Sequence, residues 1–484
     1  MKSLPFLILY LCLPILTLAQ ATSPSTIIPT GNPIGVSYVE ISPDGKYLLS
    51  CSSSDALVWE ISSGKPLYSY KVPSKLPGEM ARFSPDGKKL LTGSISPSGP
   101  GVIANQWDLL SKEVITEFRS TKSYGSILCY SADGALIGTT GVNGKIEIWD
   151  AATAERKYSL QVGLGVKDLM IMPDGKSVFF CYEGAEIWDL ASGKKIASMQ
   201  AGKAYDTYQH ACITSDGLYA AVSNGQNVTV FKGGSYDFYR EFKGHKRHVT
   251  SMAFSSDNHT LASGSTDGTL KLWDATSGRK LFDISMGIPL SEDELDDISL
   301  NFKGAAGFVN AVCFSPDGKT IYAGLGNREI RAYDVATGQL EQTFAGTEMT
   351  MEYIFVDEAK HLIYLRHKAT TEVKIFNYET LSIKNMPPDD GIKWEHFGVK
   401  GPDRFYSIVS SQSLRIYDKT DKFLGAFYFL GDKDWYFFNK ERSFDCSPGA
   451  YNYIFYLDGL LPKKITSADP RHKSGIVAQL FKKQ

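Results

Sequence analysis

Apolar and polar residues recur in a fixed local order along the first two thirds of the chain. A short apolar stretch is followed by a polar tetrapeptide and then by a second apolar stretch, as in Val309 to Phe314, Ser315-Pro316-Asp317-Gly318 and Thr320 to Ala323. In such a tetrapeptide proline presets φ, aspartate hydrogen-bonds to its own backbone, and glycine accepts a positive φ. Each copy therefore predicts two antiparallel strands joined by a tight turn.

The tetrapeptide occurs seven times, and its aspartates are 42, 47, 41, 42, 41 and 60 residues apart. The copies are Ser42-Pro43-Asp44-Gly45, Ser84-Pro85-Asp86-Gly87, Ser131-Ala132-Asp133-Gly134, Met172-Pro173-Asp174-Gly175, Thr214-Ser215-Asp216-Gly217, Ser255-Ser256-Asp257-Asn258 and Ser315-Pro316-Asp317-Gly318. An aromatic residue follows each turn, and two later units keep the aromatic residue without the turn: Trp59, Trp107, Trp149, Trp188, Phe231, Trp273, Tyr333, Phe376 and Tyr417. A period near 42 residues with four short strands predicts the blade of a β-propeller, because such a sheet buries both faces only between neighbouring blades.

This pattern resembles the WD-repeat family across roughly residues 35 to 430. The residues that carry the resemblance most closely are Gly244-His245, Ser263, Ser265, Asp267-Gly268 and Trp273-Asp274. The resemblance implies that four of them form the family's hydrogen-bonded structural tetrad: His245, Ser263, Asp267 and Trp273. Other repeats have lost the Gly-His pair, so we expect the same fold with less regular blades.

We therefore expect an all-β protein with a single β-propeller of about eight to nine four-stranded blades. The expected organisation is a leader at 1–19, an N-terminal extension at 20–34, the propeller at 35–418 and a C-terminal module at 419–484. The main alternative is seven blades with two units left over. The last segment resembles the module that follows the repeats in bacterial WD-repeat proteins, some of which continue into a caspase-like peptidase. The 66 residues after Asp418 are too few for a peptidase, so we expect the module to complete or cap the propeller, with a short helix near Gly475 to Phe481.

The first residues have the pattern of a secretory leader. Lys2 precedes an apolar run from Leu4 to Leu18, and Thr17-Leu18-Ala19 offers small residues for cleavage. The run is shorter than the roughly 20 apolar residues that span a bilayer. We expect cleavage near Ala19 and a secreted or periplasmic mature chain without a membrane span; a retained anchor is the alternative.

Charge and cysteine positions limit the partners and the chemistry. The chain has 51 basic and 53 acidic residues, a balance that argues against a nucleic-acid partner. Cys129, Cys212 and Cys313 each lie four residues before the turn aspartate of their own repeat. Equivalent positions on different blades are too far apart for a disulfide, so we interpret these cysteines as small buried apolar residues.

No catalytic, phosphate-binding or metal-binding motif occurs in the mature sequence, and we predict no cofactor and no metal. The eight histidines show no metal-ligand spacing. The acidic stretch Glu292, Asp293, Glu294, Asp296 and Asp297 lacks the ligand spacing of a calcium loop, and a solvated loop is favoured over a calcium site.

Two insertions mark the face of the propeller where we expect binding. They lie at Ser94 to Gly101 and roughly at Met286 to Lys303, in connections that open on the same face of the WD-repeat fold. The position seven residues before the start of each tetrapeptide should also reach this face, and in most repeats it holds an aromatic or imidazole side chain. By this criterion the predicted partner-binding residues are Tyr124, Tyr208 (beside Thr207), His248, Phe308 and, by looser alignment, Trp394.

Two functions remain open from the sequence. The favoured one is a non-catalytic scaffold outside the cytoplasm that binds a protein, a peptide or a surface glycan. The alternative is a propeller hydrolase or lyase with carboxylates or histidines converging in the central channel. A deep channel site with two or more converging titratable groups would favour the enzyme, and an aromatic-rimmed face would favour the scaffold.

Overall fold

The computed structural model is all-β, as the sequence predicts, and its described elements are β-strands. The described residues are 26–27, 35–52, 55–71, 81–93, 101–120, 127–140, 144–182, 184–199, 208–287, 307–345, 351–357, 360, 362–367, 373–377, 379–380, 382–386, 395–396, 398–400, 404–409, 413–418, 420, 422–430, 434–439, 443–448, 450, 455–458, 461–465, 467–474 and 476. Within them, no helix has the length and apolar character needed to cross a membrane.

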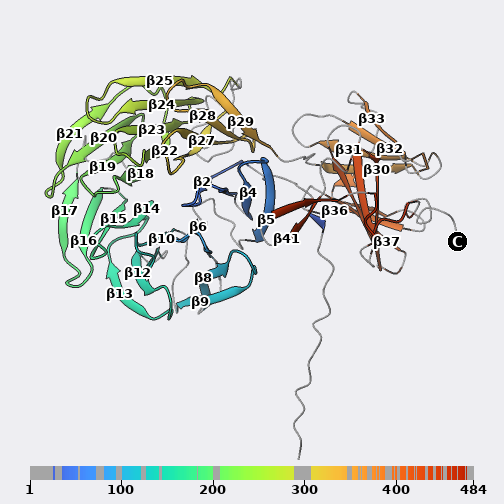
Figure 1. Cartoon of the computed structure of the whole chain (residues 1–484), viewed down its shortest axis with the longest axis horizontal. Helices are drawn as coiled ribbons and strands as arrows, with labels where there is room; N and C mark the ends of the chain where they lie inside the picture. The colour runs from blue at the N-terminus through green and yellow to red at the C-terminus, as the bar shows by residue number, and fades with distance from the viewer. Residues whose placement is uncertain are drawn as a thin grey trace, which may run out of the picture.

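The strands between Tyr38 and Phe344 form seven four-stranded antiparallel sheets, which we number blades 1 to 7 (Figure 1). Blades 1 to 3 are β2 (Tyr38–Ile41), β3 (Tyr47–Cys51), β4 (Asp55–Glu60), β5 (Lys65–Lys71); β6 (Ala81–Phe83), β7 (Lys89–Gly93), β8 (Gly101–Asp108), β9 (Val114–Ser120); and β10 (Leu128–Tyr130), β11 (Leu136–Thr140), β12 (Lys145–Asp150), β13 (Arg156–Gln161). Blades 4 and 5 are β14 (Asp168–Ile171), β15 (Ser177–Cys181), β16 (Ala185–Asp189), β17 (Lys195–Met199); and β18 (Tyr208–Ile213), β19 (Tyr219–Asn224), β20 (Asn227–Lys232), β21 (Asp237–Phe242). Blades 6 and 7 are β22 (Val249–Phe254), β23 (Thr260–Ser265), β24 (Thr269–Asp274), β25 (Lys280–Ser285); and β26 (Val309–Phe314), β27 (Thr320–Leu325), β28 (Ile330–Asp334), β29 (Leu340–Phe344).

The ring closes after seven blades. Its first strands β2, β6, β10, β14, β18, β22 and β26 contact one another in that order, and β26 contacts β2 again. Across the closing seam Val36 N–H donates to the Leu325 carbonyl at 3.0 Å. The side chain of Val36 also fills the space left by Gly324, as Val309 fills the space left by Gly264 one blade earlier. Blade 1 therefore packs on blade 7 as blade 7 packs on blade 6, and no room remains for an eighth blade.

This closure corrects the expected blade number. The four-stranded blades are confirmed, but the propeller has seven of them rather than eight or nine, which is the alternative that the sequence left open. The two units around Phe376 and Tyr417, which lack the Asp-Gly turn, lie outside the ring in sheets of five and six strands.

Strand direction gives the ring two different faces. Because each blade is an antiparallel meander, the connections between blades and between second and third strands lie at one end of the strands. We call this end the loop face and the opposite end, with the two tight turns of each blade, the turn face. The tetrapeptides behave as predicted: Gly45 has φ of 71°, and Asn258, where the other copies have glycine, has φ of 62°.

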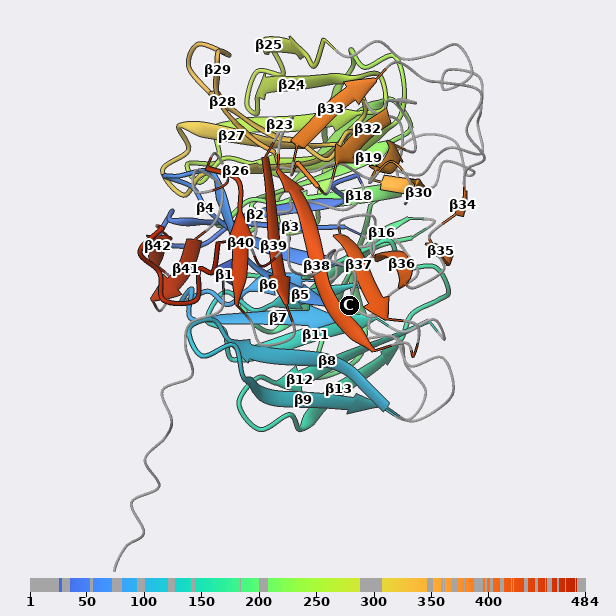
Figure 2. The same cartoon turned by 90° about the vertical axis from the view of Figure 1, so that its right-hand side faces the viewer.

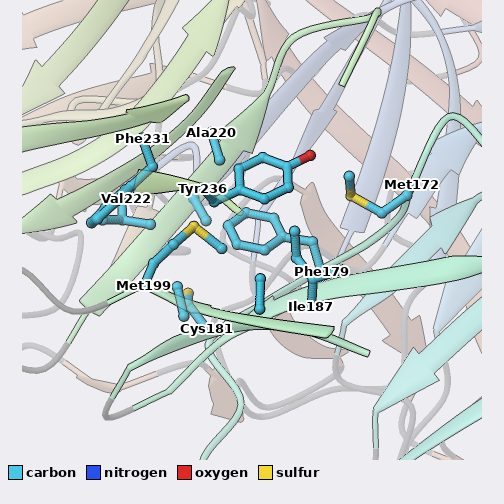
Figure 3. Packing of buried hydrophobic residues seen from close by; sticks show 12 residues of the cluster. Met172, Phe179, Cys181, Ile187, Met199, Ala220, Val222, Phe231 and Tyr236 are labelled. Carbon is cyan, nitrogen blue, oxygen red and sulfur yellow. The ribbon is translucent and has the colours of Figure 1, made fainter. Parts of the chain in front are cut away.

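The core lies between neighbouring blades. Figure 3 shows the interface between blades 4 and 5, where Phe179 and Met199 of blade 4 pack with Val222, Phe231 and Tyr236 of blade 5. All are buried, since each sheet covers a face of the next. This packing makes the ring a rigid base for the loops at its ends.

The chain after the ring forms two larger sheets (Figures 1 and 2). One contains β30 (Met351–Asp357), β31 (Leu362–His367), β32 (Val373–Asn377), β33 (Ser382–Met386) and β34 (Glu395–His396). The other contains β35 (Gly398–Lys400), β36 (Arg404–Val409), β37 (Ser413–Asp418), β38 (Phe423–Leu430), β39 (Asp434–Asn439) and β40 (Phe444–Cys446). Phe376 of the first sheet packs against Phe427 of the second, with ring centroids 4.9 Å apart. The boundary expected at 418/419 therefore falls inside a sheet, because β37 pairs with β38.

The N-terminal segment pairs with the C-terminal part. Strand β1 (Thr26–Ile27) lies antiparallel to β41 (Phe455–Asp458), which pairs with β42 (Leu461–Lys464). The helix expected at 475–481 lies outside the described residues apart from Ile476.

Candidate functional site

The four side chains that the sequence assigned to a tetrad form one hydrogen-bonded chain in blade 6. Trp273 Nε1 donates to Ser263 Oγ at 2.9 Å. Ser263 Oγ lies 2.7 Å from His245 Nε2, and His245 Nδ1 lies 3.1 Å from Asp267 Oδ2. Since the Asp267 carboxylate only accepts hydrogen bonds, His245 Nδ1–H donates to it, and the Ser263 hydroxyl, which accepts the Trp273 N–H, donates to Nε2. The tetrad thus runs from the blade core, where Ser263 and Trp273 are buried, to the loop face.

Asp267 is the charged end of the tetrad. Burial acts to raise the pKa of Asp267, but hydrogen bonds from His245 and Thr269 outweigh burial and hold this pKa well below its usual range. The carboxylate also accepts the backbone N–H of Lys246 at 2.8 Å. Asp267 therefore fixes the connection that leads into blade 6, and its carboxylate accepts hydrogen bonds from His245, Lys246 and Thr269.

Other blades keep shortened versions of this network. The tryptophan of blade 2 donates to Thr92 at 2.8 Å and that of blade 3 donates to Thr139 at 3.1 Å. In blade 4 Phe180 takes the place of the serine or threonine, and Trp188 donates instead to Glu186 at 2.7 Å. A buried indole N–H needs an acceptor, so the tryptophan is kept only where the blade supplies one.

Besides the Asp267 contact of Lys246, two more hydrogen bonds hold the backbone of the connection Lys246–Arg247–His248. Ser265 Oγ donates to the Arg247 carbonyl at 3.3 Å, and Thr266 N–H donates to the His248 carbonyl at 3.0 Å. Lys246 and His248 are exposed and Arg247 is half-buried. Three consecutive residues are thus presented at the loop face on a fixed backbone.

The structure places the predicted partner-binding residues in different environments. His248 is exposed at the loop face. Tyr208 begins β18 at the loop-face end of blade 5. Tyr124 and Trp394 lie outside the described residues, and Trp394 directly precedes β34, which is not a strand of the ring.

Phe308 corrects the prediction. Its exposed fraction is 2%, so the ring belongs to the core next to Val309 and does not offer a surface contact. The rule selects the same backbone position in blades 6 and 7, since the His248 carbonyl accepts the Thr266 N–H and the Phe308 carbonyl accepts the Gly326 N–H, each at 3.0 Å. The polar His248 is exposed there, whereas the apolar ring of Phe308 is buried, so the position alone does not determine exposure.

Both insertions join strands at the loop face. The first connects β7 to β8 and the second connects β25 to β26. Residues 94–100 and 288–306 lie outside the described residues, and so does the acidic stretch 292–297. Among the described residues, no group of three or more His, Cys, Asp or Glu side chains could hold a metal ion.

The first strands of the blades line the central channel. On each of them, the position four residues before the turn aspartate is equivalent, and in five of the seven blades it holds a titratable side chain. In blade order this position holds Glu40, Arg82, Cys129, Met170, Cys212, Ala253 and Cys313. Glu40 Oε2 accepts the Phe83 N–H at 2.8 Å, and Arg82 Nε donates to the Leu128 carbonyl at 2.9 Å. Burial raises the pKa of Glu40 to about 8, against the lowering effect of the Phe83 hydrogen bond.

The hydrogen bonds of Glu40 and Arg82 to the backbone of the next blade have a structural cause that was not predicted from the sequence. The first strand of each blade pairs with a partner on one side only, so its other edge has unpaired backbone groups. Asp168 accepts the Ala211 N–H at 3.1 Å and Ser251 accepts the Val312 N–H at 3.1 Å, each across a blade junction. A polar residue two or four positions before a turn is the signal that could have predicted them. Within the described residues, the channel carboxylates of Glu40 and Asp168 thus each bind the backbone of the next blade.

Six cysteines lie in the described residues, and four of them, Cys51, Cys129, Cys181 and Cys212, are buried. Burial raises the pKa of Cys129 to about 11 and raises those of Cys212 and Cys313 as well. Thiols with raised pKa values are poor nucleophiles. These cysteines act as small buried side chains.

Comparison with known proteins identifies related repeats. A family model described as "WD domain, G-beta repeat" matches residues 25–60, 236–274 and 298–334. The chain is 25% identical to apoptotic protease-activating factor 1 of Rattus norvegicus over 232 residues, which are 47% of this chain and 17% of that protein. It is 25% identical to WD repeat-containing protein 1 of Gallus gallus over 224 residues, 44% of this chain and 34% of the relative. It is 26% identical to serine-threonine kinase receptor-associated protein of Gallus gallus over 240 residues, 46% of this chain and 62% of the relative. The matched part therefore spans less than two thirds of each of these relatives.

Proposed function

We propose that the chain is a non-catalytic scaffold that holds a protein or peptide partner on the loop face of its ring, outside the cytoplasm, because three of its segments match the WD-repeat family model. The observation that carries this proposal is the connection 246–248. Its backbone is fixed by Asp267, Ser265 and Thr266, while its side chains are exposed or half-exposed. A fixed surface loses little conformational freedom on binding, which favours affinity.

The chemistry of the channel supports a scaffold over an enzyme. General acid–base catalysis needs titratable groups within reach of a substrate. Glu40 and Asp168 instead accept backbone N–H groups of neighbouring blades. A role for these carboxylates in holding blades together accounts for their burial without a reaction.

The relatives support a function through partners. Two of them are named for what they do to or with another protein: one for activating a protease and one for associating with a receptor. To this chain we extend only the mode of action, which is binding a protein.

The proposed location rests on the leader pattern from Lys2 to Ala19. The four buried cysteines are compatible with an oxidising compartment, because burial keeps their thiols from reaching one another or an oxidant. Mass spectrometry of the extracellular or periplasmic fraction should find a mature chain that begins near Gln20. Cytoplasmic protein with Met1 intact contradicts this part of the proposal.

The binding face can be tested with two histidines of the same blade. His248 is exposed at the loop face, and His259 is exposed beside the turn aspartate on the turn face. Proteins that bind the mature chain from its own compartment are captured and quantified with wild type, His248→Ala and His259→Ala. We expect His248→Ala alone to reduce capture by at least threefold with an unchanged melting temperature. Equal capture by all three chains, or loss only with His259→Ala, contradicts the assignment of the loop face.

A further inference from the structure

The six-stranded sheet after the ring, β35 to β40, has a second face opposite its contact with Phe376 (Figure 2). Side chains alternate between the two faces along a strand. Since Phe427 packs against Phe376, the next residue, Tyr428, belongs to the other face. We call this the outer face, and its described members on β38, β39 and β40 oppose one another in register: Tyr428, Tyr436, Phe438, Phe444 and Cys446.

The outer face is covered near β40 and less completely toward β38. Ala450 and Ile465 are buried against Phe444, which is itself fully buried. Tyr428 and Phe438 belong to the same cluster, but both are half-buried. Their rings stack with centroids 6.1 Å apart. A pair of large rings thus continues an apolar cluster whose cover is complete on one side only.

The chain that follows comes back to the edge of this face. Phe444 N–H donates to the Arg471 carbonyl at 3.0 Å, and Lys473 N–H donates to the Phe444 carbonyl at 2.8 Å, so this segment lies parallel to β40. The His472 ring packs on the Phe444 ring with centroids 5.3 Å apart, which extends the cover of the outer face. Ile476 N–H then donates to the Lys473 carbonyl at 3.3 Å, so the chain turns at this point. The residues after Ile476 therefore start beside the outer face.

Residues 476–481 have the sequence pattern of a short helix with one apolar side. The apolar residues recur at positions that share a side of a helix, and they are Ile476, Val477, Leu480 and Phe481. A helix rises about 1.5 Å per residue, so these six residues extend over about 8 Å. Neighbouring strands lie about 4.8 Å apart, so a helix of this length that starts beside β40 reaches β39, which carries Phe438.

We propose that residues 476–481 dock as an amphipathic helix on the outer face, with Leu480 and Phe481 against Phe438 and Tyr428. The contact of His472 with Phe444 already brings the segment onto this face, and the docked helix continues the same cover. This placement differs from the cap on the propeller expected from the sequence. It goes beyond the proposed function and does not depend on it, because the occupant of the outer face is a segment of the same chain.

Hydrogen exchange of the full mature chain, read by mass spectrometry, tests the docking. The double variant Leu480→Asp with Phe481→Asp places two charges on the apolar side of the helix. We expect amides of β38, β39 and β40 to exchange about tenfold faster in this variant, since an apolar side chain that loses its burial changes an equilibrium by at least about that factor. Amides of blades 2 to 6 should exchange as in wild type.

A matched double variant adds the same charge to the opposite side of the helix. Ala478 and Gln479 lie between the apolar pairs in sequence and on the other side of a helix, so Ala478→Asp with Gln479→Asp should exchange as wild type does. Equal acceleration by both double variants would show that no particular side of the segment is bound, and the docking would be wrong. Unchanged exchange of β38 to β40 in both variants would also overturn it. Faster exchange in the blades alone would assign the segment to the ring, as the sequence led us to expect.

A cross-link tests the same contact without added charge, in case the aspartate variants fail to fold. Cys446 is half-exposed and packs with the cluster of the outer face, so it offers a thiol on that face. Val477→Cys should be joined to Cys446 of the same chain by a short bis-maleimide, whereas Ala478→Cys, on the other side of the helix, should be joined much less. Peptide mapping identifies the linked residues. Equal or preferential linking of Ala478→Cys, or no link from Val477→Cys, would overturn the docking. Links between two chains that disappear on dilution would assign the outer face to a second copy instead.

Discussion

The tetrad of blade 6 allows a quantitative test of how much its hydrogen bonds stabilise the ring. Ser263→Ala removes the oxygen that accepts the Trp273 N–H and donates to His245 Nε2, without adding a group. Ser263 is fully buried, and His245 and Trp273 are nearly so, so water cannot replace the lost partner. Two buried polar atoms then lose their partners at once.

Each such atom costs about 1 to 3 kcal/mol. We therefore expect Ser263→Ala to lower the free energy of unfolding by about 2 to 6 kcal/mol, since two atoms lose their partners. Thr139→Val is the matched control, because Thr139 accepts the Trp149 N–H at 3.1 Å in a blade without the histidine. It leaves the Trp149 indole without its acceptor and also removes a long hydrogen bond of 3.5 Å to the Glu147 carbonyl, so it should cost about 1 to 3 kcal/mol, less than Ser263→Ala.

Urea unfolding of each variant, monitored by hydrogen exchange of the blade 6 and blade 3 amides, measures the two losses under the same conditions. The unfolding midpoints are compared at a common slope, since neither change alters the surface exposed on unfolding. Equal losses for the two variants would refute the idea that the histidine adds to the network. A loss below about 1 kcal/mol for Ser263→Ala would mean that the hydrogen-bonded chain is not formed in solution.

Three further predictions follow from buried groups. Asp267→Asn should lower the free energy of unfolding at pH 7, and the difference from wild type should shrink as the pH falls below about 4. The reason is that a carboxylate whose pKa is lowered by folding loses its stabilising effect as the pH falls below its unfolded pKa. Urea titrations at pH 7, 4 and 3 measure this difference. Phe308→Ala should cost about 3 to 5 kcal/mol in thermal or urea unfolding, as removal of a buried ring does, whereas a stable variant with weakened capture would return Phe308 to the binding surface. Cys129 and Cys212 should react with a thiol reagent only in denaturant, and Cys446, which is partly exposed, should react first in the native protein; early labelling of the two channel cysteines, identified by peptide mapping, contradicts their burial.

The local structure of the ring was predictable because short sequences determine it. The Asp-Gly turns, the strands that flank them and the tetrad at Trp273 depend on residues within one repeat. The number of blades was not predictable in the same way. It depends on how closely two sheets approach, which contacts such as Val36 over Gly324 decide between residues 288 positions apart.

The candidate site was predicted less completely than the fold. The sequence indicated the loop face and His248, but it selected rings by position and so included the buried Phe308. It passed over Lys246 and Arg247, since charged residues in a connection look like any solvated loop. Their distinction is the hydrogen bonding of their backbone to Asp267 and Ser265, and this becomes visible only when two connections of the blade lie side by side.

The N-terminal strand gives the last prediction, because it separates the stability of the ring from that of the C-terminal part. Strand β1 pairs with β41, whereas the first blade contacts the ring through Val36, which follows the segment 28–34 in the chain. A chain that begins at Gly35 should keep the closing contacts of Val36 with Leu325 and Asn310, and with them the unfolding midpoint of the ring. The same chain leaves one edge of β41 without its neighbour, so amides of residues 455–464 should exchange faster than in a control chain that begins at Ser25 and retains β1. Unchanged exchange at 455–464 would show that β1 does not hold the C-terminal sheet. A lower midpoint for the ring would show that the segment before Gly35 contributes to closure, which the contacts of Val36 alone would then fail to explain.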